Sequence, residues 1–400
     1  MEPGIGLIGC GVMGRVLAKL VTRQDPGLRV VALYDPDPGS VAATRASFEG
    51  PPRVHPSHRA LIDDPEVAWV MIASWNRFHA GQVMDALAAG KHVFCQKPLA
   101  TDLEEAVALA EAWRTARRHV VLGFTLRFAG HYRRIHERLR AGAIGRLVSF
   151  EQNETLEFNH GGYIMGDWRR LRRNAGTHLL EKCCHDIDLL HWLSGSRPRR
   201  VASFGGLDVF TPENAGLVEQ VGRDAEGREA YRTWPSLVGE HPFLAEKDIV
   251  DNQVALIELE SGVRGTFHTN CNAGIPERRL LLCGTEGAIR ADLVAGTIEE
   301  RRIGFDTRTQ RLDATSPDRH GGGDTVLARE LADCMLGGTA PAAGFREGLE
   351  ATLSCLAIDR ALDEGEVVDL APTWERIDAR LGDPGPSPRA GNPGPRSDVP

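Results

Sequence analysis

No apolar run in this sequence approaches the roughly 20 residues that a membrane-spanning helix needs. Basic residues are not in excess either, since 47 lysines and arginines stand against 55 aspartates and glutamates. The net charge of −8 excludes a global positive field that would attract nucleic acid or an anionic membrane. The first apolar run begins at Gly4, and we take this to leave no room for a signal peptide. We therefore expect a cytoplasmic protein whose partners are neither nucleic acid nor membrane.

The cysteines lack the paired spacing of a disulfide framework or of a zinc site. All eight are scattered along the chain, mostly within predicted strands and helices, so we expect reduced and buried thiols. Cys183 and Cys184 directly precede His185, but adjacent ligands of this kind do not match the spaced pairs that hold zinc. The sequence therefore predicts no metal site.

Length and composition predict a globular protein with two domains. The 400 residues suffice for two ordinary domains, and the 42% apolar and 26% charged content is typical of a globular chain. From Gly382 onward the chain is rich in Pro, Gly, Ser and Arg and poor in apolar residues, which predicts disorder. The expected organisation is a dinucleotide-binding domain over residues 1–123, an α+β domain over 124–381 and a disordered tail over 382–400.

The periodicity of apolar residues changes between the two predicted domains. Residues 1–123 alternate apolar runs with amphipathic stretches, which predicts a Rossmann fold, a doubly wound parallel sheet covered on both faces. Such sheets bind ligands at the C-terminal ends of their strands. Beyond residue 124 we expect an α+β domain with a large open, mainly antiparallel sheet for substrate binding and oligomerisation. The expected strands are 147–157, 199–210, 249–259, 263–272, 279–283, 288–293 and 297–303, the expected helices 178–193, 325–336 and 345–364, and the expected loop or lid 213–247.

A glycine-rich turn carries the first functional signal. The pattern GxGxxG spans residues 9–14, follows an apolar run and precedes an amphipathic stretch, and a second apolar run ends in Asp35 about 20 residues later. Gly9 permits the tight turn and Gly11 lets the backbone approach a pyrophosphate, while Gly14 lets helix and strand pack closely. This order of elements is the fingerprint of a dinucleotide site.

The fingerprint favours NAD as the cofactor. Asp35 is suited to accept hydrogen bonds from the hydroxyls of the adenosine ribose, whereas a 2′-phosphate would meet its carboxylate. No Arg or Lys follows until Arg45, so NADP lacks a cationic partner there. The residues expected to hold NAD at this turn are Gly9, Gly11, Val12, Met13 and Asp35.

Three further segments follow predicted strands or lie on the first long helix of the second domain. Residues 74–79 read SWNRFH, residues 95–98 read CQKP, and residues 181–188 read EKCCHDID. Together with the glycine turn, these segments resemble the Gfo/Idh/MocA family of NAD(P)-dependent sugar oxidoreductases, which includes glucose–fructose oxidoreductase and inositol dehydrogenase. Further similarities lie at 86–93, 123–128 and 142–145, and the resemblance covers residues 4–370 in the right order.

The resemblance implies roles for single residues. Lys97 and His185 match the family pattern well. Trp75 stands where the family usually has Pro, Gln96 where it has Glu, and Glu181 where Asp is frequent. Beyond the glycine turn, the residues implied to contact the cofactor are Ser74, Trp75, Asn76, His79, Gln96, Lys97, Arg127, Trp168 and Arg169, with helix capping as the alternative for His79.

The chemistry of hydride transfer accounts for the same residue types. Oxidation of an alcohol carbon requires a base for the hydroxyl proton and a positive group beside the developing alkoxide. His185 suits the first task, because histidine ordinarily titrates near neutral pH, and Lys97 suits the second. Glu181 lies four residues before His185 on one helix face, and we predict that these three residues are catalytic and contact the substrate. Asp188, one turn further, is expected either to bind substrate or to make a structural hydrogen bond.

Other polar residues are weaker candidates for substrate binding. The run 169–173 contains four arginines, which is unusual in an acidic chain. One interpretation is a solvated or subunit-facing charge run. The other is that an arginine such as Arg170 or Arg172 binds an anionic substituent through its guanidinium fork. Tyr163 and His320 are further candidates, although His320 also fits a loop before a helix that Asp324 caps.

These observations predict an NAD-dependent enzyme that oxidises a secondary hydroxyl of a sugar, an inositol or a sugar derivative, neutral or anionic. One alternative is an NAD-dependent glycosidase that oxidises its substrate transiently, eliminates the leaving group, adds water and returns the hydride. Another is a non-catalytic regulator that senses NAD or a sugar. We also expect a homodimer or homotetramer, because the open sheet would otherwise expose apolar residues of 254–259 and 263–267.

Overall fold

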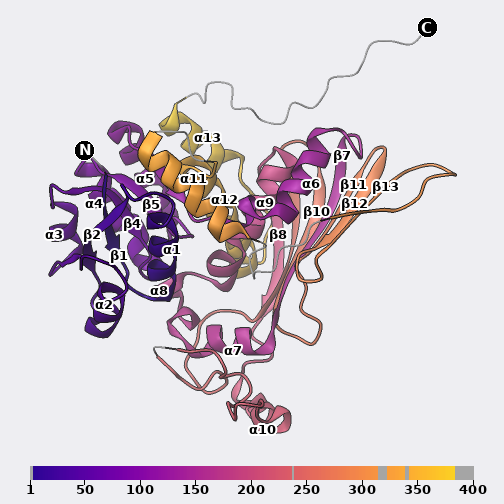
Figure 1. Ribbon diagram of the computed structural model, residues 1–400. Helices are drawn as coiled ribbons and strands as arrows, with labels where there is room; N and C mark the ends of the chain where they lie inside the picture. The colour runs from indigo at the N-terminus through magenta and orange to yellow at the C-terminus, as the bar shows by residue number, and fades with distance from the viewer. Residues whose placement is uncertain (1–2, 237, 314–321, 338–341, 383–400) are drawn as a thin grey trace.

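The computed structural model describes residues 3–236, 238–313, 322–337 and 342–382. A six-stranded and a nine-stranded sheet organise these residues, and helices α9 and α12 lie between the two sheets (Figure 1). Within the described residues, no helix is both long enough and apolar enough to cross a bilayer. Apart from Gly382, the predicted tail lies outside the described residues.

The first sheet is the predicted Rossmann sheet. Its strands are all parallel and run in the order β3-β2-β1-β4-β5-β6. The strand order reverses between β1 and β4, which opens a ligand crevice at the C-terminal ends of these strands. The strands are β1 (Gly4–Ile8), β2 (Arg29–Tyr34), β3 (Arg53–Val54), β4 (Val67–Ile72), β5 (His92–Cys95) and β6 (Val120–Leu122), and the covering helices are α1 (Val12–Thr22), α2 (Pro38–Arg45), α3 (His58–Ile62), α4 (His79–Ala88) and α5 (Leu103–Ala116).

The second sheet contains nine strands in the order β14-β13-β12-β11-β7-β10-β9-β8-β15. Neighbouring strands are antiparallel except β7 and β10, so the sheet is mixed but mainly antiparallel, as predicted. All seven predicted strands are present, although β8 ends at Gly206 and not at residue 210; β14 and β15 are additional. The strands are β7 (Leu147–Glu157), β8 (Pro198–Gly206), β9 (Asn252–Leu259), β10 (Arg264–Ala273), β11 (Arg279–Gly284), β12 (Gly287–Asp292), β13 (Thr297–Arg302), β14 (Gln310–Leu312) and β15 (Val368–Asp369).

Side chains alternate between the two faces of the second sheet. In β9, Ala255 and Ile257 are buried. Val254 and Leu256, on the opposite face, are 46% and 57% exposed, and Phe204 of the neighbouring strand β8 is also exposed. The period of two residues therefore separates a face that packs against helices from a face that lies open in the described part of the chain.

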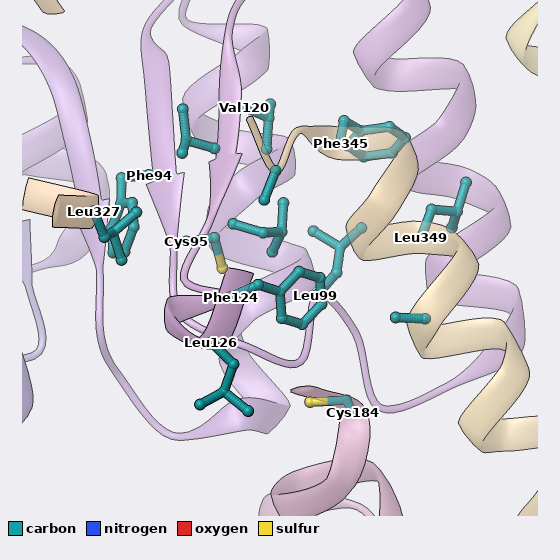
Figure 2. Close-up of a cluster of buried hydrophobic side chains, with 14 of the residues drawn as sticks. Phe94, Cys95, Leu99, Val120, Phe124, Leu126, Cys184, Leu327, Phe345 and Leu349 are labelled. Carbon is teal, nitrogen blue, oxygen red and sulfur yellow. The ribbon is translucent and has the colours of Figure 1, made fainter. Parts of the chain in front are cut away.

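A continuous hydrophobic core joins the two sheets. Figure 2 shows Phe94 and Phe124, from the Rossmann domain, in one cluster with Phe345 and Leu349 of α12. Because a helix from the end of the chain completes the packing of the first domain, the crevice and the second domain hold fixed positions relative to each other. The remaining helices are α6 (Gly130–Arg140), α7 (Phe158–Gly166), α8 (Arg172–Ala175), α9 (Cys184–Ser194), α10 (Leu217–Val221), α11 (Gly323–Gly337), α12 (Phe345–Glu364) and α13 (Ala371–Leu381).

The connection between β8 and β9, residues 207–251, is more structured than a polar loop. It contains α10 and a small core of its own, in which Phe210, Tyr231 and Phe243 are buried. This core includes residues of β7 and α7, such as Leu156 and Ile164. We call residues 207–251 the insertion segment. Its buried apolar residues attach it to the second sheet.

The cysteines behave as predicted. All eight lie in the described residues and are free thiols, seven of them buried and Cys283 half-buried. Burial raises the pKa of the Cys10 thiol to about 12, and such thiols are poor nucleophiles at neutral pH. In the described ranges, no three His, Cys, Asp or Glu side chains are grouped as metal ligands.

Candidate active site

The glycine turn connects β1 to α1 at the centre of the Rossmann sheet. Gly9 has a φ of +93°, and a Cβ there would lie 2.4 Å from the carbonyl carbon of Ala73. A Cβ at Gly14 would lie 2.1 Å from the Gly9 carbonyl oxygen, so glycine lets α1 pack on the turn. At Gly11, the N-cap of α1, a Cβ would have no atom within 4 Å. Two glycines therefore serve close packing, and the third faces open space at a helix N-terminus, where phosphates bind favourably.

Asp35 lies directly after β2, beside this turn. Its Oδ2 accepts a 2.7 Å hydrogen bond from the Cys10 backbone N–H, and its Oδ1 accepts a 2.8 Å bond from the Asp37 N–H. Val12 and Met13, at the start of α1, are 64% and 46% exposed, and the first turn of α1 carries no acidic side chain. The open glycine, the uncharged helix start and the fixed carboxylate fit a dinucleotide, whose pyrophosphate and ribose match these groups.

Lys97 follows β5 and reaches into the second domain. Its Nζ donates a hydrogen bond to the backbone carbonyl of Glu181 and lies 3.4 Å from Glu181 Oε1. Glu181 belongs to a π-helical turn (Leu179–Cys183) that directly precedes α9, so the predicted helix 178–193 is not α-helical in its first part. Because a π turn shifts backbone hydrogen bonds from i+4 to i+5, a carbonyl in it can accept a bond from outside the helix. The turn thus presents a backbone and a side-chain oxygen of one residue to Lys97.

Glu181 is held in its ionised form by two cations. Its Oε1 also accepts a hydrogen bond from Arg169 Nε at 3.2 Å. Burial alone would raise the pKa of Glu181, but Lys97 and Arg169 outweigh burial and lower the pKa to about 2. Such a carboxyl does not exchange protons near neutral pH. The geometry therefore favours Glu181 as a residue that positions Lys97 over a role as acid or base.

His185 lies one helical turn after Glu181, near the start of α9. Its side chain is 9% exposed and meets Phe124 edge to face, with ring centroids 5.9 Å apart. Phe124 follows β6 of the Rossmann sheet. The structure therefore brings the predicted catalytic residues Lys97, Glu181 and His185 to the junction between the C-terminal edge of the first sheet and α9.

Aromatic rings extend this junction on the side of the β4–α4 connection. Trp75, from the Rossmann domain, stacks on Trp168 with ring centroids 5.0 Å apart and planes 7° apart. The Arg169 guanidinium lies 4.3 Å from the centre of the Trp168 ring and donates a 2.8 Å hydrogen bond to the Tyr163 hydroxyl. Trp75, where the family usually has Pro, thus makes a contact between domains. Tyr163, Trp168 and Arg169, all predicted from the sequence, form one cluster with Glu181.

Asn76 and His79 make contacts inside the protein. The Asn76 side chain is buried and donates a 2.9 Å hydrogen bond to the Ala175 carbonyl. His79 is fully buried, with Nδ1 2.7 Å from the Pro98 carbonyl oxygen and Nε2 3.1 Å from the Ser74 carbonyl oxygen. No part of the His79 side chain reaches the surface, which favours a structural role over the predicted cofactor contact.

Ser74 and Gln96 lie at the ends of neighbouring strands, β4 and β5. The Ser74 hydroxyl donates a 2.7 Å hydrogen bond to Gln82 Oε1. A Cβ at Gly123 would lie 2.7 Å from Gln96 Oε1, so the glycine leaves room for this side chain. Both residues therefore lie at the ligand-binding edge of the sheet, where the sequence places them.

Arg127 and Asp188 form a buried ion pair with each other. Arg127 Nε and Nη2 lie 2.6 and 2.7 Å from the two carboxylate oxygens, and the side chains are 8% and 1% exposed. Arg127 Nη1 also donates to the Ala342 carbonyl at 3.2 Å. For Asp188 the structure favours the structural alternative. Arg127 connects α9 to the segment that follows β6, and its predicted cofactor contact stays a prediction.

Arg170 and Arg172, the two arginines predicted to bind substrate, have hydrogen-bond partners outside the cluster around Lys97. Arg170 Nε donates to the Glu246 carbonyl at 3.0 Å. Arg172 makes two hydrogen bonds, 2.7 and 2.9 Å long, to the carboxylate of Asp363 on α12. These partners favour the surface interpretation over the anion site for Arg170 and Arg172, whereas Arg169 of the same run is bonded to Glu181. His320, the last predicted substrate residue, lies outside the described residues.

A buried ionic network behind α9 escaped the sequence analysis. Lys182 Nζ lies 3.2 Å from Glu154 of β7, and Arg278 lies 2.9 Å from Glu154 and 2.6 Å from Asp186. All four side chains are at most 16% exposed. No local pattern signals this network, because its members come from three distant segments. It connects the helix that carries His185 to the second sheet.

Two family models match the chain. Residues 4–124 match the oxidoreductase family with an NAD-binding Rossmann fold, and residues 136–370 match the C-terminal α/β domain of the same oxidoreductase family. The two matches together include the glycine turn, Lys97 and the helix with His185.

Individual relatives agree with these matches. Inositol 2-dehydrogenase 2 of Saccharopolyspora erythraea is 35% identical over 277 residues, which are 68% of this chain and 68% of that protein. Inositol 2-dehydrogenase 3 of the same organism is 26% identical over 381 residues, or 93% of this chain and 96% of that protein. A solved structure of levoglucosan dehydrogenase with NADH and levoglucosan has a TM-score of 0.75 at 22% identity, over 93% of this chain and all of that chain. At this identity the structural likeness shows the fold.

The Arg127→Met variant should lose about 3–5 kcal/mol of unfolding free energy, because the Asp188 carboxylate stays buried without its partner. Denaturant titration followed by circular dichroism measures this loss. The double variant Arg127→Met/Asp188→Leu should recover most of it, since apolar side chains often replace a buried ion pair at little cost. Its affinity for NADH, measured by calorimetry, should equal that of the wild type. A stable single variant, or a double variant that binds NADH poorly, would contradict the structural role.

Proposed function

Because the chain belongs to the Gfo/Idh/MocA oxidoreductase family, we propose that it is an NAD-dependent dehydrogenase for a secondary hydroxyl of a sugar, an inositol or a sugar derivative. The observation that carries this proposal is the contact of Lys97 with Glu181, one helical turn before His185. The relatives that act on inositol support a polyhydroxylated substrate.

NAD, when bound, supplies the acceptor for the hydride. Gly11 and the start of α1 would hold its pyrophosphate, and Asp35 would hold the adenosine ribose. The stacked pair of Trp75 and Trp168 spans the boundary between the Rossmann domain and the second domain. The carboxylate of Asp35 disfavours the 2′-phosphate of NADP.

The residues around Lys97 can divide the work on the substrate hydroxyl. The Lys97 ammonium is suited to bind the hydroxyl oxygen and stabilise the negative charge that develops on it. Glu181, ionised and bonded to Arg169, keeps that ammonium in place. His185 accepts the proton. In this scheme the cationic Lys97 matches the negative charge that develops on the substrate oxygen, and His185 takes the proton that leaves it.

The two alternative functions gain no support from the relatives described above, which are dehydrogenases. A silent regulator would not need the Lys97–Glu181 pair. We also propose a neutral substrate, because Arg170 and Arg172 have partners away from Lys97.

We further propose that the chain forms a homodimer or homotetramer through the open face of the second sheet. Val254, Leu256 and Phe204 expose apolar side chains there on adjacent strands, with Phe204 paired to Val254 in register. A contiguous apolar surface on a sheet is typical of a subunit interface.

The Lys97→Ala and His185→Ala variants should each lose about 10²–10⁴-fold in turnover of the polyol that the wild type oxidises, because each removes a group needed in the transition state. Production of NADH, followed by absorbance, measures turnover, and calorimetry should show that both variants still bind NAD. Arg173→Ala, an exposed change in the same region, serves as the control. Near wild-type turnover in either variant would exclude the assigned role.

The wild type should bind NAD more tightly than NADP, and Asp35→Ser/Pro36→Arg should shift the ratio of the two dissociation constants toward NADP by about tenfold or more. The variant removes a carboxylate and adds a cation where the 2′-phosphate would lie. Calorimetric titration measures both constants. Asp37→Ser keeps a helix cap and should leave the ratio unchanged. Tighter binding of NADP by the wild type would refute the cofactor proposal.

Light scattering should show an oligomer at micromolar concentration, and Val254→Glu/Leu256→Glu should convert it into a monomer, because two carboxylates would be buried in the interface. Val221→Glu is the control, since this valine is 50% exposed and lies on α10, outside the second sheet. A monomeric wild type would rule out the assembly.

A further inference from the structure

Trp234 is a half-buried indole of the insertion segment that packs beside the candidate active site. It stacks on His160 of α7, with ring centroids 4.3 Å apart and planes 22° apart. It also lies 5.4 Å from the ring of Tyr163, measured between centroids, at a tilt of 39°. His160 and Tyr163 are three residues apart and therefore share one face of α7.

This face of α7 leads directly to the charged cluster. The Tyr163 hydroxyl accepts a hydrogen bond from Arg169, which donates to Glu181, the partner of Lys97. Burial, supported by the positive charge of Lys182, lowers the pKa of His160 to about 2. The imidazole that stacks on Trp234 is therefore neutral, and it forms an uncharged aromatic surface with the indole.

The backbone of the insertion segment is held firmly on both sides of Trp234. A Cβ at Gly162 of α7 would lie 2.0 Å from the Tyr231 carbonyl oxygen, and the Tyr231 N–H donates a 2.8 Å bond to Asn159. On the other side, the Ser236 hydroxyl bonds to Asp167. Tyr231 has a φ of +66°, a conformation that a non-glycine residue keeps only when its surroundings enforce it. The position of Trp234 thus depends on a close approach of the Tyr231 backbone to α7, which only a glycine at position 162 permits.

The core of the insertion segment does not need this tryptophan. Phe210, Tyr231 and Phe243 fill that core and are at most 4% exposed. Trp234 instead contacts the helix face that adjoins Arg169. The indole lies outside that core and contacts Tyr163, the partner of Arg169, and aromatic side chains are typical of the walls of ligand sites.

We propose that Trp234, stacked on His160, forms a wall of the substrate site and selects substrates whose hydroxyls are carried on a ring. The inference rests on the proposed function and adds the shape of the substrate to it. A sugar or cyclitol ring presents a flat face of C–H groups that can pack on an indole, while its hydroxyl edge reaches Lys97. An open-chain polyol must lose more conformational freedom to present a comparable face.

The test compares Trp234→Ala, Trp234→Phe and the wild type with NAD and two classes of substrate, cyclic (myo-inositol, D-glucose) and open-chain (D-sorbitol, xylitol). Trp234→Ala should raise KM for the cyclic substrate by about 10- to 100-fold and leave kcat within about threefold, because stacking contributes binding and not chemistry. Trp234→Phe should restore most of the affinity. KM for any open-chain substrate should not change.

Leu244→Ala, in the same segment and 58% exposed, is the control for a general disturbance of the fold, together with thermal unfolding of every variant. Equal changes of KM for cyclic and open-chain substrates, or a loss of kcat alone, would overturn the inference. If the wild type oxidises none of the four compounds, the proposed function fails for this substrate class. The contact of Trp234 with a cyclic substrate is then tested by calorimetric titration of the cyclic compounds into the NADH-loaded wild type and the NADH-loaded Trp234→Ala variant. Weaker binding by Trp234→Ala would support the inference, and equal or no binding by both proteins would overturn it.

Discussion

The junction of the two domains depends on the burial of one carboxylate. Glu181 is 8% exposed, and a carboxylate so far removed from water is stable only when opposite charges replace its hydration. Lys97 arrives from the Rossmann domain and Arg169 from the second domain, so this requirement joins the two domains at the ligand-binding edge of the first sheet. The π turn at Leu179–Cys183 adds a backbone oxygen to the same contact. The candidate active site therefore forms where the fold has to neutralise a charge.

The buried aspartates of α9 are neutralised by cations in the same way. Asp188 is matched by Arg127 from the segment after β6, and Asp186 by Arg278 from the segment before β11. Each acid on this helix thus has a cation from a different element, which fixes both the rotation and the position of the helix. His185 lies between the two pairs. These two ion pairs stabilise the fold, and they also determine the position of His185, the proposed proton acceptor.

Two tryptophans lie around the charged cluster of Lys97, Glu181 and Arg169. Trp75, which stands where the family usually has Pro, stacks across the domain boundary on Trp168. The insertion segment carries Trp234 to α7. Both rings lie around the charged cluster, not within it, so the chemistry and the shape of the substrate site depend on different residues.

The sequence by itself determined the local features of this protein. The glycine turn, the alternation of strands and helices and the seven strands of the second sheet follow from residue types at short spacings, because steric and hydrogen-bonding constraints act over a few residues. Lys97 and His185 became candidates through the family resemblance of their segments and the chemistry of hydride transfer. Only the tertiary structure decided which oppositely charged side chains form ion pairs with each other. Arg127 bonds to Asp188 and Arg172 to Asp363, 61 and 191 residues away, and these contacts give protein partners to three residues that the sequence suggested as ligand contacts. Trp234 gives no local signal for the same reason. A linear pattern specifies what a side chain can do, whereas the packing of distant elements selects its partner.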